Sequence, residues 1–186
     1  MSWDEAAATF DNEPDHGLRD PAVKAAWSAV LLPRLPSRRC RIADLGCGTG
    51  SVTALFAAAG HEVHGVDQSP RMLELARAKC GEGADFLLGD AADPPLERGS
   101  YDVVFSRHVL WTLPEEAVGR WVELLRPGGK LVLVEGRWST GAGLTAEECR
   151  GLVLGHRQQA VVTPLTDREL WGGPIDDERY LLVSDV

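Results

Sequence analysis

The sequence lacks both a long hydrophobic run and a metal-binding cysteine pattern. Its four cysteines form no C-x-x-C pair and stand at no Cys/His spacing typical of zinc. No segment is apolar for long enough to predict a membrane span, and the acidic start, Met1 to Glu5, does not resemble a signal peptide. We therefore expect a cytoplasmic protein with reduced thiols, no bound metal and no membrane partner.

Positive charge is scarce as well. The chain has 19 Lys and Arg against 28 Asp and Glu, which gives a formal net charge of −9. The one basic cluster lies at residues 34–41, and we interpret it as a solvated linker. Nucleic-acid-binding proteins carry a basic patch or stripe, so we expect no nucleic-acid partner. The length of 186 residues and the hydrophobic content of 44% suit one globular domain.

A glycine-rich turn is the most informative segment. Residues 42–45 are apolar except for Asp44, and residues 51–59 have the composition of a helix. Between them stand three alternating glycines, Gly46, Gly48 and Gly50. This order predicts a buried strand, a tight turn and a helix start, where glycine lets the backbone approach a nucleotide-type ligand. The G-x-G-x-G spacing does not fit the dinucleotide fingerprint G-x-G-x-x-G.

This turn resembles motif I of the class I S-adenosylmethionine-dependent methyltransferases, and later segments resemble further motifs of that family. Asp67 ends a short strand and opens a D-x-S-x-x-M-L run. Residues 86–91 end in the G-D-A that follows the third strand of the family. Residues 101–105 resemble its fourth strand, and residues 126–131 resemble the R-P-G-G turn before its fifth. The motifs stand in family order over roughly residues 40–135, so chance agreement is a poor explanation.

The resemblance implies a Rossmann-like α/β fold, with a doubly wound, mostly parallel seven-stranded sheet and helices on both faces. The alternation of strand and helix patterns agrees with it. The expected strands cover residues 41–47, 62–67, 84–89, 101–106, 130–136, 159–164 and 180–183, the last two as a hairpin-like edge pair. The expected helices cover residues 20–32, 51–59, 70–79, 114–125 and 145–157.

One helix of the usual alternation is missing from this prediction. Pro94 and Pro95 follow the third strand, and adjacent prolines break a helix, so we expect a loop there. The whole chain forms one methyltransferase domain in this interpretation. It comprises an N-terminal lid or helical segment (1–36), a cofactor-binding core (37–137), and a substrate loop with the last strand pair (138–186).

The resemblance also implies where the cofactor S-adenosylmethionine binds. It places Asp44 near the methionine ammonium group, Asp67 on both ribose hydroxyls, and Asp90 with the Ala91 amide on adenine. Met72 is either a contact to adenine or a core residue. The expected cofactor-binding residues are Asp44, Gly46, Cys47, Gly48, Gly50, Asp67, Gln68, Met72, Asp90, Ala91 and Arg107.

The segment after the fourth strand is expected to face the methyl group. His108 stands there, and an imidazole can act as a general base near neutral pH, although a structural hydrogen bond is the alternative. His16, in the N-terminal segment, is the second catalytic candidate, with an ordinary loop histidine as its alternative. Trp111 and Trp138 follow the fourth and fifth strands and suit a flat or apolar acceptor. Glu135, at the end of the fifth strand, could orient a substrate or pair with an arginine, and we favour the structural pairing.

Together these features predict an enzyme that transfers a methyl group to a small molecule. The acceptor would be an oxygen or nitrogen atom, the reaction an in-line displacement, and the second product S-adenosylhomocysteine. Two alternatives stay open, because fold does not fix function. The chain could bind the cofactor and catalyse another reaction, or it could be a non-catalytic binding subunit.

Overall fold

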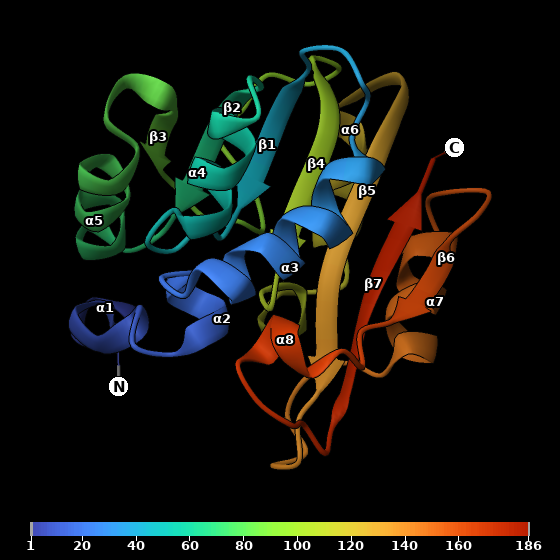
Figure 1. Ribbon diagram of the computed structural model, residues 1–186. Helices are drawn as coiled ribbons and strands as arrows, with labels where there is room; N and C mark the ends of the chain where they lie inside the picture. Colours follow the sequence, from blue (N-terminus) through green and yellow to red (C-terminus); the bar gives the residue numbers. More distant parts are fainter. Residues whose placement is uncertain (1, 186) are drawn as a thin grey trace.

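The computed structural model describes residues 2–185 and contains one seven-stranded sheet (Figure 1). The strand order is β3-β2-β1-β4-β5-β7-β6, and β7 runs antiparallel to both of its neighbours. The strands are β1 (Arg41–Leu45), β2 (Glu62–Asp67), β3 (Asp85–Leu88), β4 (Tyr101–Arg107), β5 (Leu125–Arg137), β6 (Val161–Pro164) and β7 (Glu178–Ser184). The predicted seven-stranded, mostly parallel sheet is confirmed.

Eight helices connect or cover these strands within the described residues. They are α1 (Trp3–Phe10), α2 (Pro14–Gly17), α3 (Pro21–Leu31), α4 (Ser51–Ala58), α5 (Pro70–Cys80), α6 (Ala117–Leu124), α7 (Ala146–Leu154) and α8 (Arg168–Trp171). No helix among residues 2–185 combines the length and apolarity needed to cross a membrane.

The core has two layers, one on each face of the sheet. Side chains alternate along the central strands, so Val103 and Phe105 of β4 pack on one face and Val104 packs on the other. The first face is covered by α3, α4 and α8, and the second by α6 and α7. Burial of the sheet on both faces is the physical reason why its strands are nearly continuous apolar runs.

Local sequence signals set most helix starts. Ser69 caps α5 through its hydroxyl, which accepts the N–H of Met72, and Pro70 follows at the first helical position. Thr145 and Glu148 form a reciprocal capping box at the start of α7. The loop predicted after β3 from the two prolines is confirmed, because no helix lies between β3 and β4 in this part of the described chain.

Several predicted boundaries are wrong. β5 begins at Leu125 rather than 130, because Leu125 already pairs with Tyr101 of β4, and the R-P-G-G residues form an irregularity before the pairing resumes at Lys130. α7 ends at Leu154, before the predicted 157. The last two strands do pair, but β7 lies between β5 and β6, so β6 alone forms the edge. Trp171 lies in α8, and its buried ring packs edge-on against Trp27.

The N-terminal segment lies over the carboxyl ends of the parallel strands (Figure 1). Asp4 of α1 accepts a hydrogen bond from the Ser69 hydroxyl at the start of α5. Asp11 pairs with Lys79 of α5 at 2.9 Å and also accepts the Thr49 hydroxyl of the glycine-rich turn. α1 and α2 are therefore tied to the edge of the sheet where ligands bind in open α/β folds.

Candidate active site

A cavity of about 240 Å³ lies beneath α1 and α2, beyond the ends of β1, β2, β4 and β5. Its walls come from segments far apart in the chain: residues of the lid, the glycine-rich turn, the end of β2, the loop after β4 and the end of β5. The residues that line it include Gly48, Asp67, His16, His108, Trp111 and Trp138. A smaller cavity of about 40 Å³ adjoins it and reaches Asp44.

The three glycines of the turn have different reasons to be glycine, although all have positive φ angles of 71°, 54° and 76°. A Cβ on Gly46 would overlap the side chain of Val109, and one on Gly50 would lie 2.9 Å from the Cβ of Ala76. A Cβ on Gly48 would meet only the Phe10 ring, at 3.4 Å, because Gly48 faces the cavities. Tight packing therefore requires two of the glycines, and Gly48 leaves backbone open to a ligand.

Asp67 ends β2 with a carboxylate that is only 9% exposed. One oxygen accepts the backbone N–H of Gly48 at 2.8 Å, and the other accepts that of Ser69 at 2.9 Å. Burial raises the pKa of this carboxyl, and these backbone hydrogen bonds oppose the shift. Each oxygen keeps a second lone pair, and Asp67 lines the cavity, so the carboxylate fits a ligand with two neighbouring hydroxyls.

Asp44 lies deeper, at the end of β1. Its carboxylate is 3% exposed and accepts the hydroxyl of Thr53 at 2.5 Å. Burial raises its pKa to about 6, and the Thr53 hydrogen bond and the nearby Arg107 guanidinium limit the rise. Asp44 reaches the smaller cavity together with Cys47. Burial also raises the pKa of the Cys47 thiol well above its usual value, so Cys47 is a packed thiol rather than a nucleophile.

The residues expected at adenine divide into two pairs. Gln68 and Met72 line the larger cavity. Asp90 instead is exposed and accepts the N–H of Ala92 at 2.8 Å, and the carbonyl of Ala91 accepts the indole N–H of Trp121 at 2.7 Å. Neither of these two residues lines the two cavities beside the glycine-rich turn, so their contact with adenine stays a prediction.

Arg107 ties β4 to the N-terminal segment. Its half-buried side chain donates to the backbone carbonyl of Asp15 and lies over the ring of Trp27 at 5.2 Å. Arg107 also lines both cavities. His16, beside Asp15, stacks on Phe10 with ring centres 4.3 Å apart, and burial lowers its pKa. His16 is therefore a cavity residue and not an ordinary exposed loop histidine.

His108 has the most unusual conformation in the site. It is one of two non-glycine residues with positive φ among residues 2–185, at 60°, and strained backbone of this kind gathers at functional sites. Its ring lies 5.9 Å from that of Trp171 and 5.3 Å from that of Trp138. Its Nε2 is buried without a hydrogen-bond partner among the described residues. Burial, followed by the charges of Arg107 and Arg179, lowers its pKa well below 6.5, so the imidazole is neutral at pH 7.

Glu135 holds the loop that carries His108. It is fully buried at the end of β5, and one of its oxygens accepts the backbone N–H groups of Val109 at 3.0 Å and Leu110 at 2.8 Å. Burial raises its pKa to about 8. The expected pairing with an arginine is wrong, because this carboxyl satisfies backbone donors of the loop instead.

Sequence reasoning missed Arg179 and Asp177. The guanidinium of Arg179 stacks on Trp138 at 4.9 Å and on Trp171 at 5.3 Å, and it pairs with Asp177 at 3.1 Å. Arg179 reaches the site because β7 pairs with β5, which places it opposite Gly136. No local pattern around residues 177–179 predicts that Arg179 lies beside Trp138 and Trp171, because only the antiparallel register of β7 with β5 brings it to that position.

The central part of the chain is similar to known methyltransferases. Residues 43–133 match a family model described as a methyltransferase domain. The chain is 46% identical over 111 residues to trans-aconitate 2-methyltransferase of Methylobacterium radiotolerans, a match that covers 57% of this chain and 42% of that protein. It is 33% identical over 129 residues to malonyl-[acyl-carrier protein] O-methyltransferase of Enterobacter lignolyticus, which covers 67% of this chain and 51% of that protein. The chain thus spans about half or less of the length of these relatives.

The fold has close counterparts among solved structures. Geranyl diphosphate C-methyltransferase of Streptomyces coelicolor, solved with Mg²⁺, geranyl diphosphate and S-adenosyl-L-homocysteine, superposes with a TM-score of 0.74. The alignment covers 87% of this chain and 79% of that one, at 14% sequence identity. At this identity the likeness establishes the fold and leaves the acceptor undetermined.

Proposed function

Because the chain belongs to the class I S-adenosylmethionine-dependent methyltransferases, we propose that it transfers the methyl group of S-adenosylmethionine to a small-molecule acceptor. The acceptor atom is an oxygen or a nitrogen. The name of the malonyl-[acyl-carrier protein] relative favours oxygen.

One observation carries this proposal. A single cavity joins Gly48 and Asp67 at one end to His108, Trp111 and Trp138 at the other. The first pair offers open backbone and a carboxylate with free lone pairs, which fit the amino-acid part and the ribose of the cofactor. The three ring side chains, with planes tilted by 81° between His108 and Trp138 and by 54° between Trp111 and Trp138, offer an aromatic wall for an acceptor. The cofactor and the methyl acceptor would thus bind side by side in the same cavity.

The protein's part in the reaction is mainly positioning. The bound cofactor supplies a methyl group that is already activated by the sulfonium charge. Asp67 and the turn around Gly48 hold the cofactor, and the aromatic wall orients the acceptor so that its reacting atom points along the displacement axis. Phe10 and His16 of the N-terminal segment line the cavity and reduce the access of water to it.

A base is needed only where the acceptor atom carries a proton at the working pH. His108 suits this role because it lines the cavity, is neutral at pH 7 and has a free ring nitrogen. His16, which lines the same cavity, is the second candidate.

The proposal is tested by incubating the protein with labelled S-adenosylmethionine and a panel of phenols, carboxylic acids and amines. Mass spectrometry should find an acceptor heavier by one methyl group and an equal amount of S-adenosylhomocysteine. A product of unchanged mass would indicate a different reaction on the same fold. Cofactor binding without turnover across the panel would favour a binding subunit.

A further inference from the structure

Unpartnered polar atoms gather beside one end of the cavity, where His16 and His108 line it and Arg179, paired with Asp177, lies behind Trp138. Seven buried side-chain nitrogen or oxygen atoms among the described residues lack a hydrogen-bond partner. Five of them belong to four neighbouring residues, namely His16, His108, Asp177 and Arg179, the last contributing both Nε and Nη1. Buried polar groups are nearly always paired in folded proteins, so such a concentration indicates a place where a polar ligand binds.

Arg179 is the least satisfied of these groups. Its side chain is 11% exposed, and only Nη2 has a partner, the Asp177 carboxylate. The indoles of Trp138 and Trp171 hold the guanidinium by cation–π contacts. On the neighbouring strand β5, a Cβ on Gly136 would overlap the carbonyl oxygen of Glu178 and would lie 3.0 Å from Nη1 of Arg179, so the glycine leaves room for the paired backbone and for the guanidinium. The chain therefore builds a dedicated place for a charge directly behind Trp138, which is a wall of the cavity.

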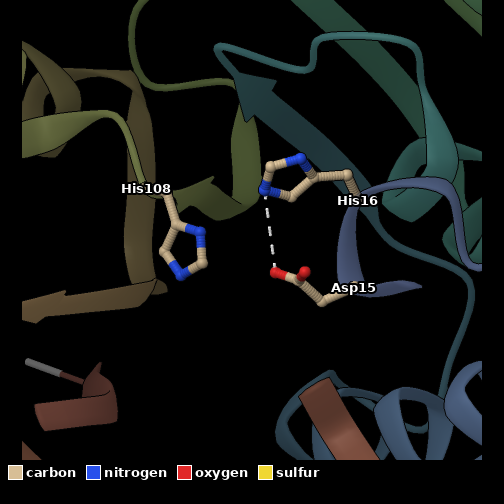
Figure 2. A group of neighbouring side chains, drawn as sticks. All are labelled: Asp15, His16 and His108. Carbon is tan, nitrogen blue, oxygen red and sulfur yellow. Dashed lines mark ion pairs between the residues drawn. The ribbon is translucent and has the colours of Figure 1, made fainter. Parts of the chain in front are cut away.

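The same end of the cavity has one arrangement that resembles a cation site. Figure 2 shows the rings of His16 and His108 beside the carboxylate of Asp15, and ligand atoms from all three residues lie within 4.8 Å of one another. Two positive groups oppose a cation here. The guanidinium groups of Arg107 and Arg179 both lower the pKa of His108, so both act as positive charges on the His108 imidazole. Asp177 pairs with Arg179 and the carboxylate of Asp15 acts on both guanidinium groups, so these acids offset part of the positive charge. The two unpartnered N–H groups of Arg179 still favour an anion over a cation.

We propose that the methyl acceptor carries a carboxylate, which lies in the cavity against Trp138 and His16, where the charges of Arg179 and Arg107 select it. The inference rests on the proposed function and adds the chemical class of the acceptor. Arg179 acts through its charge across one indole ring, in surroundings of low dielectric where such interactions are strong. Arg179 is thus a specificity-determining residue. Trp111 and Trp138 hold the apolar part of the acid.

The test measures binding of matched acid and amide pairs to the protein loaded with S-adenosylhomocysteine. The probes are 4-hydroxyphenylacetate with 4-hydroxyphenylacetamide, and hexanoate with hexanamide. Quenching of the tryptophans at the cavity reports binding. We expect each acid to bind roughly tenfold or more tightly than its amide, because a single buried charge interaction is of that order. Arg179→Met should abolish the difference, and Arg179→Lys, which keeps the charge, should retain it.

Arg150→Met is the matched control, because Arg150 bonds the carbonyl of Ala160 on the far side of β7 and should leave the preference intact. Equal binding of acids and amides, binding of no acid, or a preference that survives Arg179→Met would overturn the inference. A preference that appears only with added Zn²⁺ and disappears with a chelator would overturn it too, in favour of a cation site. Failure of the parent protein to bind S-adenosylhomocysteine by calorimetry would instead contradict the proposed function.

Discussion

The carboxylate of Asp67 accepts a 2.8 Å hydrogen bond from the backbone N–H of Gly48. This bond joins the end of β2 to the turn after β1, although the two residues are 19 positions apart in the chain. It orients the carboxylate toward the cavity and fixes the open backbone of Gly48 beside it. The Asp67 carboxylate and the turn at Gly48, which the sequence associates with the cofactor, are therefore coupled, and a substitution at either should affect cofactor binding.

Replacement of Asp67 by Ala should weaken binding of S-adenosylhomocysteine by about ten- to a hundred-fold. A hydrogen bond to a charged group contributes about 1.5–3 kcal/mol, and the carboxylate also orients the turn. Titration calorimetry on both proteins measures the change. Asp85→Ala, which removes an exposed acid from the neighbouring strand, should bind like the parent. Equal affinities for Asp67→Ala and the parent would remove Asp67 from the site.

Replacement of Gly48 by Val should abolish cofactor binding while the far-UV circular dichroism stays that of a folded protein. A side chain there must adopt φ near +54° and would project into the cavity. The left-handed conformation alone costs roughly 1–2 kcal/mol. Gly60→Val is the matched control, because Gly60 has φ +90° with no atom within 4 Å of its added Cβ. It should lose similar stability and keep its affinity for S-adenosylhomocysteine. Retained binding by Gly48→Val would mean that the ligand does not approach this backbone.

Replacement of His108 by Ala should lower turnover of a hydroxyl acceptor by about 10²- to 10⁴-fold with little change in cofactor affinity. Turnover of the parent should fall as the pH drops through the pKa of His108. Burial and two guanidinium groups lower that pKa, so this acid limb should lie below 6.5 and should vanish in the variant. His156→Ala, at an exposed histidine, is the control. A modest loss with an unchanged pH profile would refute the base role and make His16 the next residue to test.

Replacement of Glu135 by Gln should make stability less dependent on pH. Burial raises the pKa of Glu135 from 4.5 to about 8 in the folded protein, so the folded state holds a proton that the unfolded state releases. Stability from this group is therefore present below pH 4.5 and is lost as the pH rises through 8. Gln keeps an acceptor for the N–H groups of Val109 and Leu110 and does not titrate.

The melting temperature of the Gln variant relative to the parent should therefore increase between about pH 5 and pH 8, by roughly 2–4 °C per kcal/mol. Glu135→Ala leaves two buried N–H groups without an acceptor and should be destabilised throughout, by about 1–3 kcal/mol or more. Parallel melting profiles for Glu135→Gln and the parent would show that the carboxyl is ionised in the folded protein.

The sequence by itself determined the features that depend on neighbouring residues. The glycine-rich turn, the strand that ends at Asp67 and the start of α5 at Ser69 follow from φ preferences, apolar runs and capping hydroxyls. These forces act over a few positions, so they can be read directly from the chain. The order of the motifs also predicted the seven-stranded sheet and the place of Gln68 and Met72 in the cavity. Parallel strands bring their carboxyl ends to one edge of the sheet, so residues that follow different strands come together there.

Only the tertiary structure decided the end of the cavity where we propose that the acceptor binds. Arg179 reaches the wall behind Trp138 through the antiparallel pairing of β7 with β5, Glu135 holds the loop at Val109, and Arg107 binds the carbonyl of Asp15. Each contact joins segments 26 or more positions apart. Their partners are set by strand register and by the docking of the lid, and no local preference encodes either. The sequence therefore predicts the part of the cavity that we propose for the cofactor, whereas the charges near the part proposed for the acceptor come together only once the chain is folded.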